Sequence, residues 1–172
     1  MVIIMKSETA KLHQKESSKD ITCGLITLSD SRKSKKLDLS GKYIADEIEA
    51  RYTLKSRSLI PDEKEDLIKS IETMVEEGID VILTNGGTGL DTRDITVETV
   101  ESIFEKKIDG FGELFRAKSF EEIGSAALLS RATAGIYKKT IIFSMPGSPN
   151  AVKTALELII DELPHFVHHV KK

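Results

Sequence analysis

The 172-residue chain predicts one domain of the α/β class, with helices packed against a largely parallel sheet. Apolar runs of strand length, without alternating polar residues, are typical of parallel strands that are covered on both faces. Helical segments alternate with these runs along the chain, which is the order expected of a layered α/β fold. The composition, 40% hydrophobic and 31% charged, is that of a folded globular protein. We expect a loose tail over residues 1–19 and a single domain over residues 20–172.

The first half of the chain predicts three strands and two helices. Strands are expected over residues 21–28, 53–60 and 80–84, because each run is rich in apolar or β-branched residues. A helix over residues 40–51 carries apolar residues at core spacing. A second helix, over residues 62–78, has one apolar stripe and a helix-start pattern of an aspartate followed three residues later by a glutamate.

The second half predicts helices and a hairpin. Helical patterns are expected over residues 96–104 and 112–129. Two β-like runs, residues 132–137 and 140–143, are separated by two lysines and predict a hairpin. A last helix is expected to begin at Ser148-Pro149, because serine is favoured as an N-cap and proline in the first turn.

Composition and missing motifs exclude several classes of protein. A net charge of −3 argues against general binding of nucleic acid or of anionic membranes. The single cysteine, Cys23, lies in an apolar run and is expected in the core, and a reduced, cytoplasmic compartment is therefore expected. No apolar stretch is long enough for a membrane span. Dinucleotide-binding, P-loop and nucleophile-elbow motifs do not occur.

Three loops follow expected strand ends, and ligands of open α/β sheets bind at that edge. They contain Ser29 and Asp30, the glycine-rich stretch after Asn85, and the turn before the last helix. Glycines let backbone N–H groups approach an anion, and a helix N-terminus also favours phosphate. The two phosphate-binding segments predicted in this way consist of Gly86, Gly87, Thr88 and Gly89, and of Gly147 and Ser148.

Two aspartates at this edge are candidates for holding Mg²⁺. Asp62 follows a strand, and Asp94 closes the glycine-rich loop beside Arg93. Magnesium is typically held by one or two carboxylates together with substrate phosphates. The residues leave other interpretations open, since Asp62 fits a helix N-cap, Asp94 fits a surface ion pair with Arg93, and Asp30 fits a turn.

Several segments resemble the molybdopterin-binding MoaB/Mog family, to which the gephyrin G domain is related. The matching segments cover about residues 20–170 in the family's order, and they are Leu59-Ile60-Pro61-Asp62-Glu63, Leu83-Thr84-Asn85-Gly86-Gly87-Thr88-Gly89, Thr92-Arg93-Asp94-Ile95-Thr96, Gly110-Phe111-Gly112-Glu113, Ala127-Leu128-Leu129-Ser130-Arg131 and Met145-Pro146-Gly147-Ser148-Pro149-Asn150-Ala151. The stretches 112–116 and 122–124 look more like the MoaB branch than the Mog branch.

The resemblance implies a three-layer α/β/α fold that assembles as trimers or hexamers. It implies Mg²⁺- and ATP-dependent adenylylation of molybdopterin in molybdenum or tungsten cofactor biosynthesis, with a downstream metal-insertion enzyme as a further partner. Asp62 and Asp94 match the family's catalytic aspartates and are expected to place Mg²⁺. Contacts to the pterin and nucleotide are expected from Ser29, Asp30, Asn85, Gly86, Gly87, Thr88, Gly89, Arg93, Ser130, Gly147 and Ser148.

The alternative is a non-catalytic molybdopterin carrier or scaffold of the same family. Asn85 bears on this choice, because the Mog branch usually has threonine or serine there, whereas MoaB-like chains also carry asparagine. Both aspartates are present, which favours the enzyme. The segments 1–5 and 126–129 are apolar and are expected to contribute to association, and the loop over residues 33–38 is expected to cover the substrate.

Overall fold

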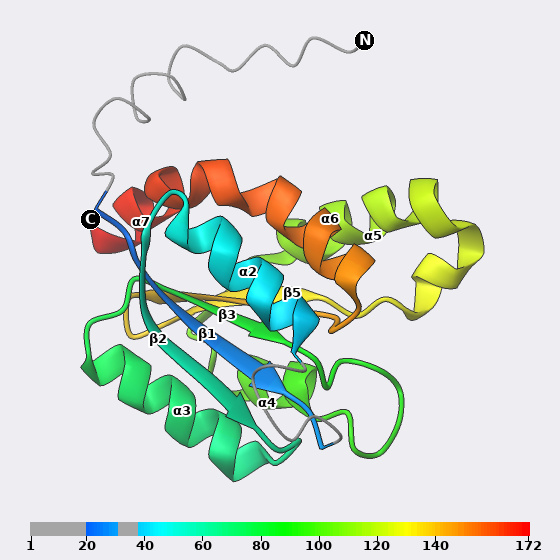
Figure 1. The fold of residues 1–172 in the computed structure, drawn as a ribbon, viewed down its shortest axis with the longest axis horizontal. Helices are drawn as coiled ribbons and strands as arrows, with labels where there is room; N and C mark the ends of the chain where they lie inside the picture. Colours follow the sequence, from blue (N-terminus) through cyan, green and yellow to red (C-terminus); the bar gives the residue numbers. More distant parts are fainter. Residues whose placement is uncertain (1–19, 31–37) are drawn as a thin grey trace, which may run out of the picture.

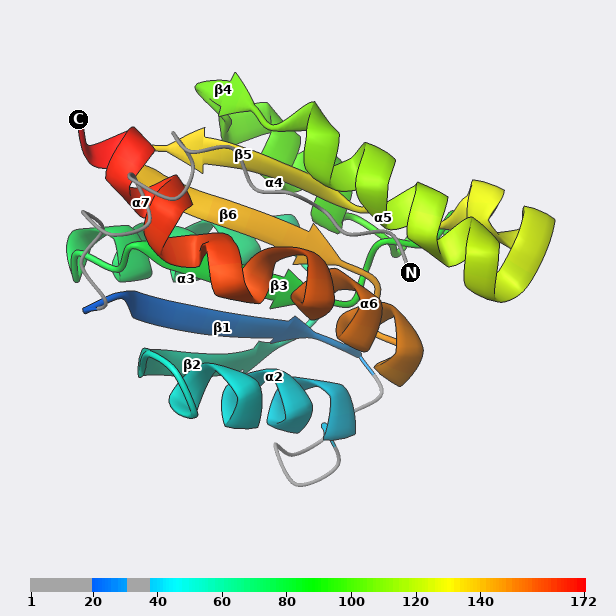
Figure 2. The same ribbon diagram turned by 90° about the horizontal axis from the view of Figure 1, so that it is seen from above.

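A computed structural model describes residues 20–30 and 38–172 as one six-stranded sheet between two layers of helices (Figure 1). The strand order is β2-β1-β3-β6-β5-β4, which can be followed across Figure 2. The strands are β1 (Thr22–Leu28), β2 (Thr53–Ile60), β3 (Val81–Asn85), β4 (Lys106–Lys107), β5 (Thr133–Tyr137) and β6 (Thr140–Met145).

The sheet is parallel where the predicted ligand-binding edge lies. Strands β2, β1, β3 and β6 run parallel to one another, whereas β5 pairs antiparallel with both β6 and β4. Strand β1 pairs with both β2 and β3, and β3 pairs with β6. The carboxyl ends of four strands therefore meet along one edge.

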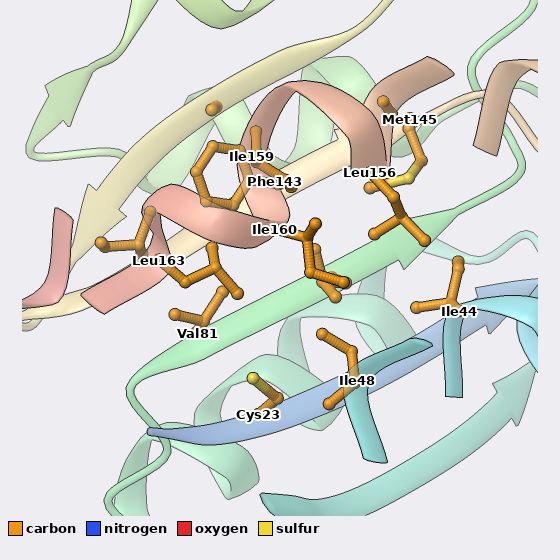
Figure 3. Packing of buried hydrophobic residues seen from close by; sticks show 14 of the residues in the cluster. Cys23, Ile44, Ile48, Val81, Phe143, Met145, Leu156, Ile159, Ile160 and Leu163 are labelled. Carbon is orange, nitrogen blue, oxygen red and sulfur yellow. The ribbon is translucent and has the colours of Figure 1, made fainter. Parts of the chain in front are cut away.

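The two helix layers close two separate apolar cores. Helices α2 (Leu39–Glu49), α5 (Asp109–Ile123), α6 (Pro149–Ile159) and α7 (Leu163–Lys171) cover one face, and α3 (Lys64–Glu76) and α4 (Thr96–Ile103) cover the other (Figure 1). Figure 3 shows the larger core, in which Ile48, Val81 and Phe143 lie between the sheet and the helices. Cys23 belongs to this core, and burial raises the pKa of its thiol to about 12. Cys23 is therefore a small core residue with an un-ionised thiol, and its predicted place in the core is confirmed.

The α/β class, the parallel strands and the hairpin are confirmed. The hairpin turns at Lys138 and Lys139, both with positive φ, as in a two-residue turn of type I′. The prediction of one helix over residues 112–129 was wrong, because α5 ends where Gly124 adopts φ +62 and a 3-10 helix, η2 (Gly124–Leu129), follows.

The start of α3 also differs from the prediction. Its N-cap is Glu63, which makes no capping hydrogen bond with its side chain, so the interpretation of Asp62 as the N-cap was wrong. The Asp62 carboxylate instead accepts a hydrogen bond from the N–H of Asp30, in the loop after β1.

The predictions for the tail over residues 1–19, including its apolar start, fall outside the described residues, as does nearly all of the loop over residues 33–38. Among the helices that the structure describes, none has the length and apolar character that crossing a membrane requires.

Candidate functional site

The ends of three strands meet around Gly86, which follows β3. Its N–H donates to the carbonyl oxygen of Met145 at the end of β6, 3.1 Å away. Gly86 has φ +96, and a Cβ at this position would collide with the carbonyl oxygen of Leu28 at the end of β1. Any other residue would be strained here and would push the strand ends apart. The glycine therefore allows the turn to sit directly on the sheet edge.

A cleft of about 390 Å³ opens beside this turn. It brings together seven residues that the sequence predicted, namely Ser29, Gly86, Gly87, Thr88, Gly89, Ser130 and Gly147, along with the carboxylate residue Asp94. Its other walls are Leu28, Pro146, and Ala126, Leu129 and Arg131 from η2 and the segment after it. The predicted edge is thus hollowed, and residues separated by more than a hundred positions line one cleft.

The glycine-rich turn is held from two sides. Thr96, at the start of α4, donates its hydroxyl hydrogen to the carbonyl oxygen of Gly86 at 2.8 Å, and its N–H to that of Gly87 at 2.9 Å. On the other side, Arg131 Nε donates to the carbonyl oxygen of Thr88 at 3.0 Å, and the same guanidinium pairs with Glu98. Arg131 was not among the predicted site residues, because a lone arginine after an apolar run carries no spacing signal.

Asp30 and Asp62 exchange hydrogen bonds between the loops that follow β1 and β2. The N–H of Asp30 donates to Asp62 Oδ2 at 2.9 Å, and the N–H of Asp62 donates to Asp30 Oδ1 at 3.1 Å. The other oxygen of Asp30 accepts hydrogen bonds from Arg93 Nε at 3.0 Å and Nη2 at 2.8 Å. These bonds lower the pKa of Asp30.

Arg93 does not pair with Asp94, so the interpretation of a surface ion pair between these neighbours was wrong. Its guanidinium bridges Asp30 and Glu63, the latter at 2.9 Å. Three loops, those after β1, β2 and β3, are thereby tied together. Asp94 instead accepts the N–H of Asp91 at 3.0 Å, which shapes its own loop.

Each of the two candidate metal-binding aspartates lies close to a different glycine of the glycine-rich turn. A Cβ on Gly87 would lie 2.7 Å from Asp62 Oδ1, and one on Gly89 would lie 2.5 Å from Asp94 Oδ2. Alternate glycines therefore leave room for two carboxylates. Burial raises the pKa of Asp62, with the carboxylates of Asp30 and Asp94 adding to the effect.

The residues present fit a magnesium ion. Asp62 Oδ1 is buried and has no hydrogen-bond partner in the described structure, so one carboxylate oxygen is left for a cation. No group of three or more metal-ligating side chains occurs within residues 20–30 and 38–172. Two carboxylates suffice where substrate phosphates complete the coordination, which is the arrangement that magnesium commonly adopts.

Five predicted site residues do not line the cleft. Asp30, Asp62 and Arg93 belong to the hydrogen-bonded group that joins the loops after β1, β2 and β3, and the other two are Ser148 and Asn85. Ser148 is exposed and caps α6, accepting the N–H of Ala151 at 3.3 Å. Asn85 is fully buried below the turn, where its Nδ2 donates to Thr27 Oγ1 at 2.9 Å. Its side chain is therefore directed into the protein.

Comparison with known proteins agrees with this geometry. The model of the family described as a probable molybdopterin binding domain matches residues 24–165. The molybdopterin adenylyltransferase of Pyrococcus furiosus is 41% identical over 165 residues, covering 93% of this chain and 97% of that protein. The molybdenum cofactor biosynthesis protein B of Bacillus subtilis is 43% identical over 164 residues, covering 93% and 96%.

A solved structure shares the fold. The tungsten cofactor synthesizing protein MoaB from Pyrococcus furiosus superposes with a TM-score of 0.85 at 40% identity, covering 91% of this chain and all of that one. The chain therefore belongs to the MoaB/Mog family of molybdopterin-binding proteins.

Proposed function

We propose that the protein adenylylates molybdopterin with ATP during molybdenum or tungsten cofactor biosynthesis. The observation that carries the proposal is the pair of aspartates around the glycine-rich turn, one of which keeps a buried carboxylate oxygen without a partner. Relatives with 41% and 44% identity are named molybdopterin adenylyltransferase and probable molybdopterin adenylyltransferase. The product would pass to a metal-insertion enzyme, and the cytoplasm is the proposed compartment.

The reaction joins two phosphates. An oxygen of the terminal phosphate of molybdopterin attacks the α-phosphorus of ATP and forms a new P–O bond. The bond from the α-phosphorus to the oxygen that bridges to the β-phosphorus breaks, and pyrophosphate leaves with the electron pair. The attacking phosphate is already ionised at neutral pH, so the site needs no strong base. Alignment and neutralisation of charge are what the protein must supply.

The cleft and the aspartates beside the glycine-rich turn have separate roles in this proposal. Backbone N–H groups of the turn from Gly86 to Gly89 and of the turn at Gly147 would hold phosphate oxygens. Asp62 and Asp94 would hold Mg²⁺, which when bound neutralises charge on the phosphates. Arg131 fixes the turn through Thr88 and so keeps its N–H groups in place.

We also propose that the protein acts as a homo-oligomer, a trimer or a hexamer. Five large apolar side chains are exposed on α5 and η2. Soluble monomers rarely expose many large apolar side chains in one region of the surface. The five side chains are Leu114, Phe120, Ile123, Leu128 and Leu129, with Leu128 81% exposed. Figure 2 shows that α5 and η2 extend beyond the sheet, so a second copy could reach this surface. The predicted segment 126–129 is part of it.

The test is product formation from purified protein, freshly prepared molybdopterin and Mg²⁺-ATP. Adenylylated pterin and pyrophosphate are measured together, because the proposed reaction forms them in equal amounts. Product that disappears when Mg²⁺ is omitted supports the proposal. Pterin binding without any product would contradict it and would favour the carrier of the same family.

A further inference from the structure

Near the carboxyl ends of β1 and β3, three buried polar residues, Asp38, Thr27 and Asn85, form a chain of hydrogen bonds. Cys23, Leu25 and Thr27 follow one another on one face of β1, and Val81, Leu83 and Asn85 do so on β3. Thr27 and Asn85 are register partners and are both fully buried. Burying polar groups in an otherwise apolar row is costly unless they are hydrogen-bonded.

The hydrogen bonds in this chain have one direction. Asp38 Oδ2 accepts the hydroxyl hydrogen of Thr27 at 2.7 Å, because a carboxylate can only accept. Thr27 Oγ1 must then accept from Asn85, whose Nδ2 donates to it at 2.9 Å. The amide of Asn85 is thereby oriented, and its Oδ1 is directed to the other side, toward the turn at Gly147.

The same chain reaches the start of α2. Asp38 is the N-cap of this helix and accepts the N–H of Gly41 at 2.8 Å. A Cβ on Gly41 would collide with the Asp38 carboxylate and lie 2.6 Å from Thr27 Oγ1, so the helix approaches β1 as closely as a glycine allows. In the same turn of helix, Ser40 donates to the carbonyl oxygen of Gly147 at 2.8 Å.

We propose that Asp38, Thr27 and Asn85 are positioning residues that set the distance between the two phosphate-binding turns. Through Asn85 the chain holds the end of β3, from which the Gly86–Gly89 turn starts. Through Ser40 the same helix start holds the Gly147 turn, and Gly147 packs on Gly86, to whose Cα a Cβ on Gly147 would lie at 3.2 Å. The inference rests on the proposed function, in which both turns bind phosphates of the same ligands.

The opposite face of the sheet offers a matched control. Thr84, the residue before Asn85, donates its hydroxyl hydrogen to Ser144 Oγ at 2.8 Å, and both residues are fully buried. This hydrogen bond is as buried as those of Thr27 and Asn85 and lies one residue earlier on β3. Unlike them, it involves no residue of α2 and no contact with Gly147. Thr84→Val therefore removes a similar buried hydrogen bond without changing the position of the turns.

The experiment compares Thr27→Val, Thr27→Ser and Thr84→Val in full-length protein. Calorimetry with Mg²⁺-ATP measures the Kd, and ¹⁵N NMR without ligand follows the backbone amides of Gly86, Gly87 and Gly147. We expect Thr27→Val to raise the Kd about 10-fold and to shift these amides. Thr27→Ser, which keeps the hydroxyl, and Thr84→Val should stay within about 2-fold of wild type.

Equal effects of Thr27→Val and Thr84→Val would overturn the proposal, and so would a Thr27→Val variant whose glycine amides and Kd are unchanged. If Thr27→Val does not fold, Ser40→Ala tests the connection between α2 and the Gly147 turn. In this variant the amide of Gly147 is expected to shift more than that of Gly87. If the wild-type protein binds no Mg²⁺-ATP, the proposed function fails, while the NMR comparison without ligand still decides whether the chain positions the turns.

Discussion

Asp30 and Asp62 hold each other through reciprocal hydrogen bonds, in which each backbone N–H donates to the other residue's carboxylate, at 2.9 and 3.1 Å. The arrangement uses one oxygen of Asp62 and leaves the other buried without a partner in the described structure. Asp62 is therefore fixed in orientation before any ligand arrives. Such preorganisation matters for a group that stabilises charge in a reaction.

Replacement of either aspartate should abolish most of the activity. Asp62→Asn and Asp94→Asn each remove a negative charge beside the glycine-rich turn while keeping the side-chain size. We expect turnover to fall by about 100-fold or more in each variant, as for loss of a preorganised electrostatic group. The measurement is the initial rate of pyrophosphate release at saturating Mg²⁺-ATP and pterin. Turnover near the wild-type rate in both variants would rule out the roles proposed for them.

Asp62 should also make the protein less stable at neutral pH. Its pKa is raised by burial, so the folded state binds the proton more tightly than the unfolded state. Stability is then lost as the pH rises from about 4 through the raised pKa. Asp62→Asn should therefore melt at a higher temperature than wild type at pH 7 without Mg²⁺, and the difference should shrink toward pH 4.

Asp80 should have the opposite effect on the pH dependence of the melting temperature, because its pKa is lowered and that of Asp62 is raised. Burial disfavours the ionised form of Asp80, but hydrogen bonds from Lys171 and Thr22 outweigh burial and lower its pKa. The stability from Asp80 is present above about pH 4 and is lost as the pH falls through the lowered pKa. Asp80→Asn should thus melt below wild type at pH 7. Thermal denaturation curves that shift in the same direction for both variants would contradict this account.

Arg93 should support activity without much effect on stability. Its side chain is 54% exposed and its guanidinium bridges Asp30 and Glu63, so its loss frees the residue that holds Asp62. We expect Arg93→Ala to reduce turnover about 10-fold, as is typical when a residue behind a metal ligand is removed. The control is Arg51→Ala, which breaks surface pairs with Glu47 and Asp161 away from the cleft. Both variants should melt near the wild-type temperature, and only Arg93→Ala should lose activity.

Gly86 should be the least replaceable glycine of the turn. Gly86→Ala combines a left-handed backbone with a collision against the carbonyl oxygen of Leu28. We expect a loss of about 3 kcal/mol in the free energy of unfolding. Gly78→Ala has a similar φ of +74 but meets nothing within 4 Å, so it should cost only about 1 kcal/mol. Urea denaturation of both variants checks the difference, and equal losses would mean that the collision is relieved.

The apolar surface of α5 and η2 should control assembly. Leu128→Glu places a charge on the most exposed of its side chains, which an interface would have to desolvate. We expect the variant to dissociate to smaller species at micromolar concentration, as measured by light scattering coupled to size exclusion. Leu90→Glu, at a leucine that is 68% exposed in the loop before α4, is the control and should leave the assembly unchanged. A monomeric wild-type protein would contradict the proposed oligomer.

The sheet, most of the helices and the edge that carries the cleft could be predicted from the residues alone. Apolar runs of strand length that end at turn residues indicate strands, and the carboxyl ends of parallel strands share an edge. Asp94 and the glycines of the turn were therefore predictable as neighbours of Gly147, and they line one cleft with it. Asp62 was predictable at the same edge because it follows a strand directly.

The pairing of polar groups, in contrast, follows from how the elements pack and could not be predicted from spacing along the chain. Asp30 and Asp62 are 32 residues apart and Arg93 is 63 residues from Asp30, so spacing along the chain says nothing about these bonds. The sequence suggested Asp94 as the partner of Arg93 and Asp62 as a helix cap. In the folded protein Arg93 instead pairs with Asp30 and Glu63, and Asp62 binds Asp30. A hydrogen bond forms only within a range of a few tenths of an ångström in the donor–acceptor distance. Such distances are set by the packing of whole elements, and for this reason the orientation of Asn85 and the role of Arg131 also emerged only from the fold.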